Sequence, residues 1–225
     1  MTLVEVMVSM AVGVVVIGAA TWFLFEGTKA SYKAMANVEN SIQQWGLATK
    51  LQIDGKIAGR VDILNSIDQT AWVSGLPLVI PVDNGDPADL LERGKVLVLT
   101  KSQLKEGYDT KIITDMVVYY YVGGNLGYTG ILKRFPQKAP DTFPITAPLD
   151  SAKNPKSVAQ LVSENVDTIT ANAALVQDHL ASIANNGPFA HFISPSNVSI
   201  ALVRQETALG TVNSTTLTEV SFNLR

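Results

Sequence analysis

The sequence predicts an α+β protein in which a long N-terminal helix leads into a mainly antiparallel β-sheet domain. The first 25 residues are almost entirely apolar and contain one charged side chain, Glu5. Apolar residues then recur at three- and four-residue spacing as far as Trp45, which is the period of one helix face. From Gly55 onward, short runs rich in β-branched and aromatic residues alternate with turn residues, as is typical of antiparallel strands.

Composition narrows the class of function. The 225 residues have a formal net charge of −3 and include no cysteine, which excludes disulfides, thiol chemistry and cysteine metal sites. The sequence has no basic run that would indicate nucleic acid binding. It also has no phosphate-binding glycine loop, nucleophile elbow or paired-acid motif. We therefore expect a protein that is not an enzyme and needs no cofactor.

The chain divides into an apolar helix at 1–25, an amphipathic helix at 26–55 and a β-rich head domain at 56–225. About 20 apolar residues are enough for one helix to cross a bilayer. Gly13 and Gly18 each weaken that helix by about 1 kcal/mol relative to alanine, so they favour either local melting or close helix packing. Asp54 and Gly55 predict the helix end. We expect the head domain to seat on one apolar stripe of the amphipathic helix, made of Tyr32, Met35, Val38, Ile42 and Trp45.

Glu5 needs a partner, because a carboxylate in an apolar helix costs several kcal/mol unless it is paired or neutralised. No lysine or arginine precedes Lys29, so the nearest cation is an amino terminus. The amine could belong to the same chain or to a neighbouring copy that is shifted along the helix axis. In the second case the charge pair would set the register between identical subunits.

The residues Met1, Thr2, Leu3, Val4 and Glu5, followed by about 20 apolar residues, resemble the mature N-terminus of the type IV pilin superfamily. That superfamily includes pilins and the pseudopilins of type II secretion. The resemblance implies a pilin fold and a structural subunit that polymerises helically through its N-terminal helix. It also implies that Met1, Thr2 and Glu5 act in assembly, with Glu5 pairing to the Met1 amine of an adjacent subunit.

The same resemblance implies a life history and a set of partners. A leader would be removed before position 1 by a prepilin peptidase, and the new amine would be methylated. The monomer would lie in the inner membrane, in contact with lipid and an assembly platform, and would then join identical subunits or other pilins and pseudopilins in an extracellular filament. Two features depart from the family: Trp22 stands where a proline is common, and no cysteines are present to close a C-terminal disulfide.

Other classes of protein share some of these features. An uncleaved signal peptide lacks its basic n-region and cleavage site here, and a generic single-span anchor is the other alternative. The strand-like sequences KVLVLT and VVYYYVGGNLGYTGILKRF resemble W-type minor pilins and J-type minor pseudopilins. A minor initiating or tip subunit, or a displayed adhesin or ligand-binding domain, is therefore the alternative to a fibre subunit.

Seven runs in the head domain predict strands: 61–67, 76–82, 95–100, 116–122, 131–135, 198–204 and 217–224. The clearest hairpin joins 116–122 to 131–135, with Gly123, Gly124, Asn125 and Gly127 at its turn. Alternation places Tyr119 and Tyr121 on one face and Tyr120 on the other, which predicts one core face and one surface face. The proline-rich passage 135–155 predicts a surface loop, and 171–184 predicts a helix.

Two groups of polar residues are candidate metal ligands. Asp83, Asp86 and Asp89 have the oxygen ligands that calcium prefers, but Asp86 before Pro87 equally predicts the cap of a short helix that ends before Gly94. Helix capping is the preferred interpretation. His179 and His191 are the only histidines, and no carboxylate or nucleophile pattern accompanies them. We expect no metal site at either position.

Overall fold

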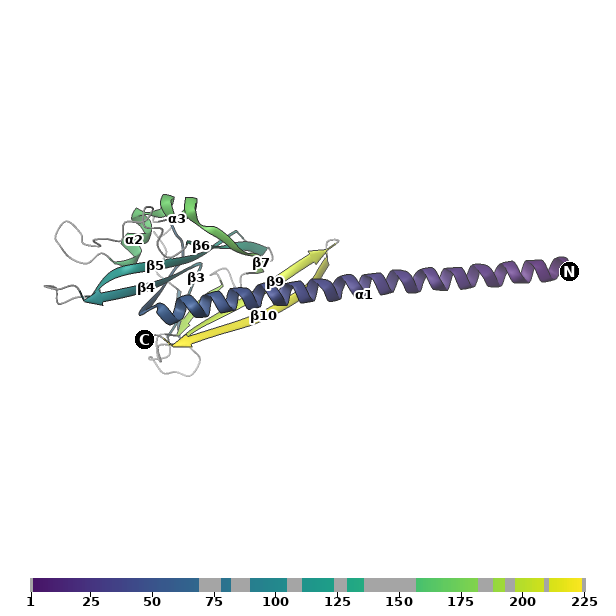
Figure 1. The fold of residues 1–225 in the computed structure, drawn as a ribbon, viewed down its shortest axis with the longest axis horizontal. Coiled ribbons are helices and arrows are strands. Elements are labelled where there is room, and N and C mark those ends of the chain that lie inside the picture. The colour runs from purple at the N-terminus through teal and green to yellow at the C-terminus, as the bar shows by residue number, and fades with distance from the viewer. Residues whose placement is uncertain are drawn as a thin grey trace. The chain divides into compact units, whose positions relative to one another are not determined.

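A computed structural model shows an α+β chain, with one long helix, two short helices and ten strands among the residues that it describes (Figure 1). The structure describes residues 2–68, 78–81, 90–104, 111–123, 129–135, 157–181, 188–192, 197–208 and 211–223. The chain forms two compact units, Met1–Asn40 and Ser41–Arg225.

The first unit is the larger part of helix α1, which runs from Leu3 to Ile57. By length and composition, this helix is sufficient to cross a membrane, although a signal sequence near the N-terminus would meet the same two criteria. The helix is continuous through Gly13 and Gly18. Their melting or close packing in an assembly stays a prediction.

The second unit is built on an antiparallel sheet. Its strands are β1 (Arg60–Leu64), β2 (Leu78–Pro81), β3 (Leu90–Gly94), β4 (Val96–Leu104), β5 (Lys111–Val122), β6 (Thr129–Phe135), β7 (Ala174–Ala181), β8 (Phe189–Phe192), β9 (Asn197–Ala208) and β10 (Thr211–Asn223). Their order is β1-β4-β5-β6-β7-β9-β8-β3-β2, and β10 pairs with β9. The prediction of antiparallel pairing is confirmed.

Both faces of the central strands are buried, which makes the head domain three-layered around β4, β5 and β6. On one face Tyr119 and Tyr121 pack with Leu47 and Leu51 of α1. On the other face Tyr120 belongs to a separate core cluster that includes residues of the short helices α2 (Val158–Glu164) and α3 (Val166–Asn172). The predicted alternation of the tyrosines is confirmed, but the expectation of a surface face is wrong, because α2 and α3 cover it.

The turn after β5 begins as predicted. Gly123 has a φ of +97°, a conformation that glycine adopts without the steric cost of a Cβ atom. The strands on either side pair in the register Tyr119 to Arg134 and Tyr121 to Leu132. The other predicted turn residues, Gly124, Asn125 and Gly127, lie outside the described residues, as do residues 136–155 of the proline-rich passage.

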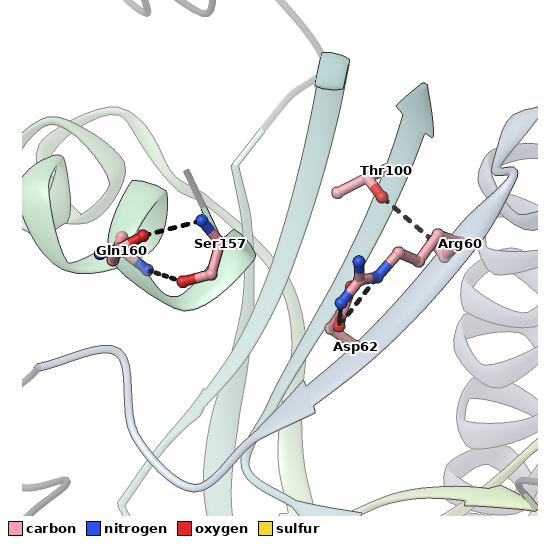
Figure 2. A network of polar contacts seen from close by, with 5 residues as sticks. All are labelled: Arg60, Asp62, Thr100, Ser157 and Gln160. Carbon is pink, nitrogen blue, oxygen red and sulfur yellow. Dashed lines mark hydrogen bonds and ion pairs between the residues drawn. The ribbon is translucent and has the colours of Figure 1, made fainter. Parts of the chain in front are cut away.

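The helix predicted at 171–184 is wrong for most of its length, because Ala174–Ala181 is strand β7 and pairs with β6. The helices lie just upstream and begin at a signal that the sequence contained. Ser157 and Gln160 form a reciprocal capping box: the Ser157 hydroxyl accepts from the Gln160 backbone N–H, and the Gln160 side chain accepts from the Ser157 N–H (Figure 2). Pairing with β6 overrides helix propensity in β7.

The short helix predicted after Asp86 also differs from the structure at its end. Leu90–Gly94 is strand β3, which pairs with β2 and with β8. Glycine is needed at position 94 because the backbone at Leu64 comes close, and not because a helix ends there. A Cβ atom on Gly94 would lie 2.5 Å from the Leu64 carbonyl oxygen.

The prediction that one apolar stripe seats the head domain is wrong for Ile42 and Trp45, which belong to the same unit as the sheet and expose 66% and 74% of their surface. Tyr32, Met35 and Val38 belong to the first unit, and their part in the stripe stays a prediction. The buried side of α1 is instead Gln44, Leu47, Leu51 and Asp54. A search for apolar periodicity misses this side because two of its four residues are polar. We call Gln44, Leu47, Leu51 and Asp54 the seated face.

Candidate functional site

The first turn of α1 brings together two of the three predicted assembly residues. A carboxylate oxygen of Glu5 accepts the backbone N–H of Thr2 at 2.8 Å, and the Thr2 carbonyl accepts the Glu5 N–H at 3.1 Å. Thr2 and Glu5 therefore have the spacing of a capping box, with the carboxylate at the positive end of the helix dipole. Met1 lies outside the described residues.

Glu5 therefore has a hydrogen-bond partner within its own chain. A carboxylate has about four lone-pair sites and can accept several donors, so its bond to Thr2 leaves capacity for a second partner. Both Thr2 and Glu5 are exposed in the single chain. The sequence spacing T-x-x-E was the available indication of the cap, and a search for a cationic partner alone does not find it.

Residues 3–25 of α1, which we call the apolar segment, present their large side chains outward on every side. From Leu3 to Phe25 these side chains expose between 41% and 79% of their surface. The segment contains two hydroxyls whose hydrogen bonds stay within the helix: Ser9 donates to the Val6 carbonyl at 2.9 Å and Thr21 to the Ile17 carbonyl at 2.7 Å. The apolar segment can therefore enter an apolar environment without leaving a hydroxyl donor unsatisfied.

A buried polar cluster of Asp54, Tyr119 and Arg134 fastens the last turn of α1 to the β5–β6 hairpin. Arg134 binds the Asp54 carboxylate with two hydrogen bonds, from Nε at 2.8 Å and from Nη2 at 2.9 Å. The Tyr119 hydroxyl donates to Asp54 Oδ2 at 2.5 Å and accepts from Arg134 Nε at 3.1 Å. This two-pronged pairing is the geometry for which a guanidinium is better suited than an ammonium.

Burial sets the protonation of this cluster. Tyr119 is fully buried, and the side chains of Asp54 and Arg134 are only 6% and 15% exposed. Burial, and then the hydrogen bond to Asp54, raises the pKa of the Tyr119 phenol well above its usual value. Burial is the largest single influence on the pKa of the Arg134 guanidinium and lowers it, but the hydrogen bonds and charge interactions with Asp54 and Tyr119 together outweigh burial, and the net direction is upward. The cluster thus holds a neutral phenol and a charged guanidinium.

The polar cluster was not predicted. Asp54 was interpreted as part of a helix end, and the tyrosines were expected to serve packing alone. The register of the hairpin is what places Arg134 directly across from Tyr119. Arg134 in the second arm of the hairpin was the available indication, but its partner on α1 lies 80 residues away in sequence.

Beside this cluster the head domain has a shallow, open hollow of only about 10 Å³, lined by residues that include Asp54, Ala58, Thr100, Lys101 and Asp115. Pockets for small molecules are typically about 300–1,000 Å³ and more enclosed. The polar atoms of the cluster are engaged with each other. The Thr100 hydroxyl in the hollow donates to the Arg60 carbonyl at 3.5 Å.

The predicted metal ligands do not form a site in the described part of the chain. Asp83, Asp86 and Asp89 lie outside it. His179 is on β7, in a left-handed conformation with φ of 51°, and His191 is on β8. Among the described residues, no three of the metal-ligating types histidine, cysteine, aspartate and glutamate gather at one point.

Comparisons with models of protein families, with curated proteins and with solved structures gave no match.

Proposed function

We propose that this protein is a structural subunit of a type IV pilus or pilus-like filament. The apolar segment holds the monomer in the inner membrane. The subunit then leaves the membrane and polymerises helically through α1, and its head domain is displayed outside the cell. The observation that carries the proposal is that α1 is one continuous helix of 55 residues whose first part is apolar and exposed and whose last turns are built into an antiparallel head domain.

The apolar segment supplies the driving force. Burying one large apolar side chain contributes about 1.5–3 kcal/mol, so the 15 exposed ones between Leu3 and Phe25 represent tens of kcal/mol. Such a surface does not remain in water. Lipid covers it in the monomer, and identical helices cover it in a filament, where a head-to-tail contact that does not close gives a fibre.

Glu5 supplies the register. Within the subunit it caps its own helix through Thr2, and in the filament its carboxylate pairs with the Met1 amine of the adjacent subunit. The partners implied are identical subunits or other pilins and pseudopilins, together with a prepilin peptidase and an assembly platform in the membrane. The subunit is not an enzyme in this proposal and binds no cofactor.

Two substitutions at Glu5 separate capping from charge pairing. Glu5→Gln keeps an oxygen that accepts the Thr2 N–H but removes the negative charge, whereas Glu5→Ala removes both. We expect both variants to remain membrane-bound with a folded head domain and both to lose filaments, by more than tenfold in the sheared fraction. Filament yield is measured by immunoblot and electron microscopy, and folding by protease resistance of the head.

Glu26→Gln is the matched control, because it removes one negative charge from an exposed position of the same helix. It should assemble as the parent does. Normal filaments from Glu5→Gln, together with loss of filaments in Glu5→Ala, would show that Glu5 acts only as a helix cap. A copy number far below that of another pilin in the same filaments would place the protein as a minor subunit.

A further inference from the structure

Strands β9 and β10 run side by side (Figure 1), and each carries an Asn-x-Ser/Thr motif that the proposed function does not use. The two motifs occupy residues 197–199 and 213–215, and neither has proline at its middle position. Such a motif is the acceptor for an N-linked glycan. These glycans are attached to surface segments, so the backbone pairing around each motif decides which one an enzyme can reach.

The motif at 197–199 is paired along both edges of its strand. Asn197 lies opposite Phe192 of β8 on one side and opposite Asn223 of β10 on the other. Ser199 is paired on both sides in the same way. Lifting this motif out of the sheet breaks two ladders of backbone hydrogen bonds at once, which makes it a poor acceptor.

The motif at 213–215 is paired along one edge. Among the strands that the structure describes, β10 pairs with β9 alone. The register of that pairing shifts between Val212 and Ser214, which leaves Asn213 as the extra residue of a β-bulge, with no residue opposite it on β9. The backbone at this asparagine is therefore already outside the ladder.

The bulge also lies close to the end of the strand pair. The ladder ends at Thr211, which lies opposite Ala208, so only two paired residues separate the bulge from that end. The ends of elements open at a smaller free-energy cost than their centres. Residues 211–215 can therefore open locally while the rest of β10, as far as Asn223, stays paired with β9.

We infer that Asn213 is an N-glycosylation site and that Asn197 is not. The donor is an oligosaccharide linked to a lipid diphosphate. The amide nitrogen of Asn213 forms a bond to the first sugar carbon, the bond from that carbon to the diphosphate oxygen breaks, the lipid diphosphate leaves, and the amide proton passes to a base of the enzyme. The inference rests on the proposed function in one respect, because it needs the head domain outside the cytoplasm, where we expect the transferring enzyme to act. A glycan there adds bulk and polar surface to the displayed head.

Trypsin separates the two motifs, because Arg204 lies between them. Peptide 205–225 contains Asn213, and peptide 157–204 contains Asn197. The full-length chain is isolated from its own organism, digested and sequenced by tandem mass spectrometry. We expect sugar residues on Asn213 and the unmodified mass for peptide 157–204. Peptide 205–225 found only at its unmodified mass, or any glycan on Asn197, would overturn the inference.

Variants of the full-length chain, produced in the same organism, test the role of each motif residue. Asn213→Gln and Thr215→Ala should reduce the glycosylated fraction more than tenfold, whereas Thr215→Ser keeps the hydroxyl and should retain at least half of it. Asn197→Gln is the matched control and should leave the glycan unchanged. The urea midpoint of each variant checks that the head domain folds. If Asn213→Gln does not fold, the comparison of Thr215→Ala with Thr215→Ser decides, and a glycan that persists in Thr215→Ala would contradict the inference.

The glycosylation inference and the filament proposal fail in different ways. Glu5→Gln should lose filaments and keep the glycan, because the modification acts on the head domain of the monomer. If the parent forms filaments and peptide 205–225 is unmodified, the glycosylation inference is wrong and the filament proposal stands. If Asn213 carries the glycan and the parent forms no filaments, the filament proposal is wrong and the glycosylation site stands.

Discussion

Asp54 and Arg134 form a buried ion pair, and Arg60 and Asp62 form an exposed one, so the chain contains its own comparison of the two environments. The Arg134 side chain is 15% exposed, whereas that of Arg60 is 60% exposed although its contact with Asp62 is 2.6 Å (Figure 2). Contact distance alone does not measure the contribution of an ion pair. Breaking a buried pair leaves one charge without water or partner, but an exposed charge is solvated again.

Arg134→Ala is expected to destabilise the head domain by about 3–5 kcal/mol, because it leaves the Asp54 carboxylate buried without its cation. Urea unfolding of the detergent-solubilised chain, followed by circular dichroism, measures the change. Arg60→Ala is the control, with an expected loss under about 1 kcal/mol. Equal losses in the two variants would show that the Asp54 pair is hydrated in solution.

Tyr119 makes the stability of the head domain depend on alkaline pH. Its folded-state pKa is raised by burial first and by Asp54 second, and burial also raises the pKa values of Tyr120 and Tyr121. A raised pKa means that the folded state holds the phenolic proton more tightly than the unfolded chain does. The stability that this provides is complete below about pH 10, the unfolded value, and is lost as the pH rises above it.

We expect the free energy of unfolding to fall above pH 10, by about 1.4 kcal/mol per pH unit for each such tyrosine. Tyr119→Phe should make that fall less steep, and at neutral pH it should cost about 1.5–3 kcal/mol through the lost bond to Asp54. Urea unfolding between pH 7 and pH 11 measures both effects. Tyr32→Phe, at a side chain that is 75% exposed, should leave the slope as it is. An unchanged slope in Tyr119→Phe would contradict the assignment.

At the scale of elements, α1 has an exposed apolar side and a buried, partly polar side between residues 41 and 57, and only the buried side packs on the sheet of the head domain. The sequence predicted the helix, its approximate end and most of the strands, since these follow from local periodicity and turn residues. It did not predict which side is seated. The seated face includes two polar residues, Gln44 and Asp54, and the Asp54 carboxylate is bound by Arg134, which only the folded sheet brings to it.

Leu51→Ala should destabilise the head domain by about 2–5 kcal/mol, because Leu51 is fully buried against the sheet. Ile42→Ala, at an exposed position of α1, should change the free energy of unfolding by less than about 0.5 kcal/mol. Thermal or urea unfolding of the two variants provides the comparison. A larger loss of unfolding free energy for Ile42→Ala than for Leu51→Ala would show that the predicted stripe seats the head domain after all.

Strand β7 and helices α2 and α3 show a second limit of local reasoning. The segment around Leu175 and Leu180 has spacing compatible with a helix, but the chain forms a strand there because the edge of β6 offers it backbone partners. The helices begin instead at Ser157, where the capping box satisfies two backbone N–H groups. The capping-box motif marks where helix α2 begins, whereas apolar spacing predicted a helix too far along the chain.

For the whole molecule, the apolar segment is the feature that determines where the protein can reside. Its length and composition are those of a membrane span, and its large side chains are exposed in the single chain. The head domain has a core of its own on both sides of the sheet. The chain therefore has one part that needs an apolar environment and one part that is packed independently of it.

Val15→Lys should weaken membrane insertion by about 2.5–3.5 kcal/mol, the cost of a lysine near the centre of a spanning helix. The fraction of full-length chain that resists alkaline extraction from membranes measures this change. Ala34→Lys, on an exposed position beyond the apolar segment, is the control and should not alter extraction. Equal extraction of the parent and Val15→Lys would place the apolar segment outside the bilayer.

The sequence alone determined that this chain has a membrane-length apolar helix with an acidic residue near its start and a head of antiparallel strands. These properties are local, because they depend on composition and on the spacing of neighbouring residues. Only the tertiary structure decided which side of α1 is buried, that both faces of the central strands are covered, and that Asp54 meets Tyr119 and Arg134. Such contacts join residues 65 and 80 positions apart, and strand register, which no local pattern contains, is what brings them together.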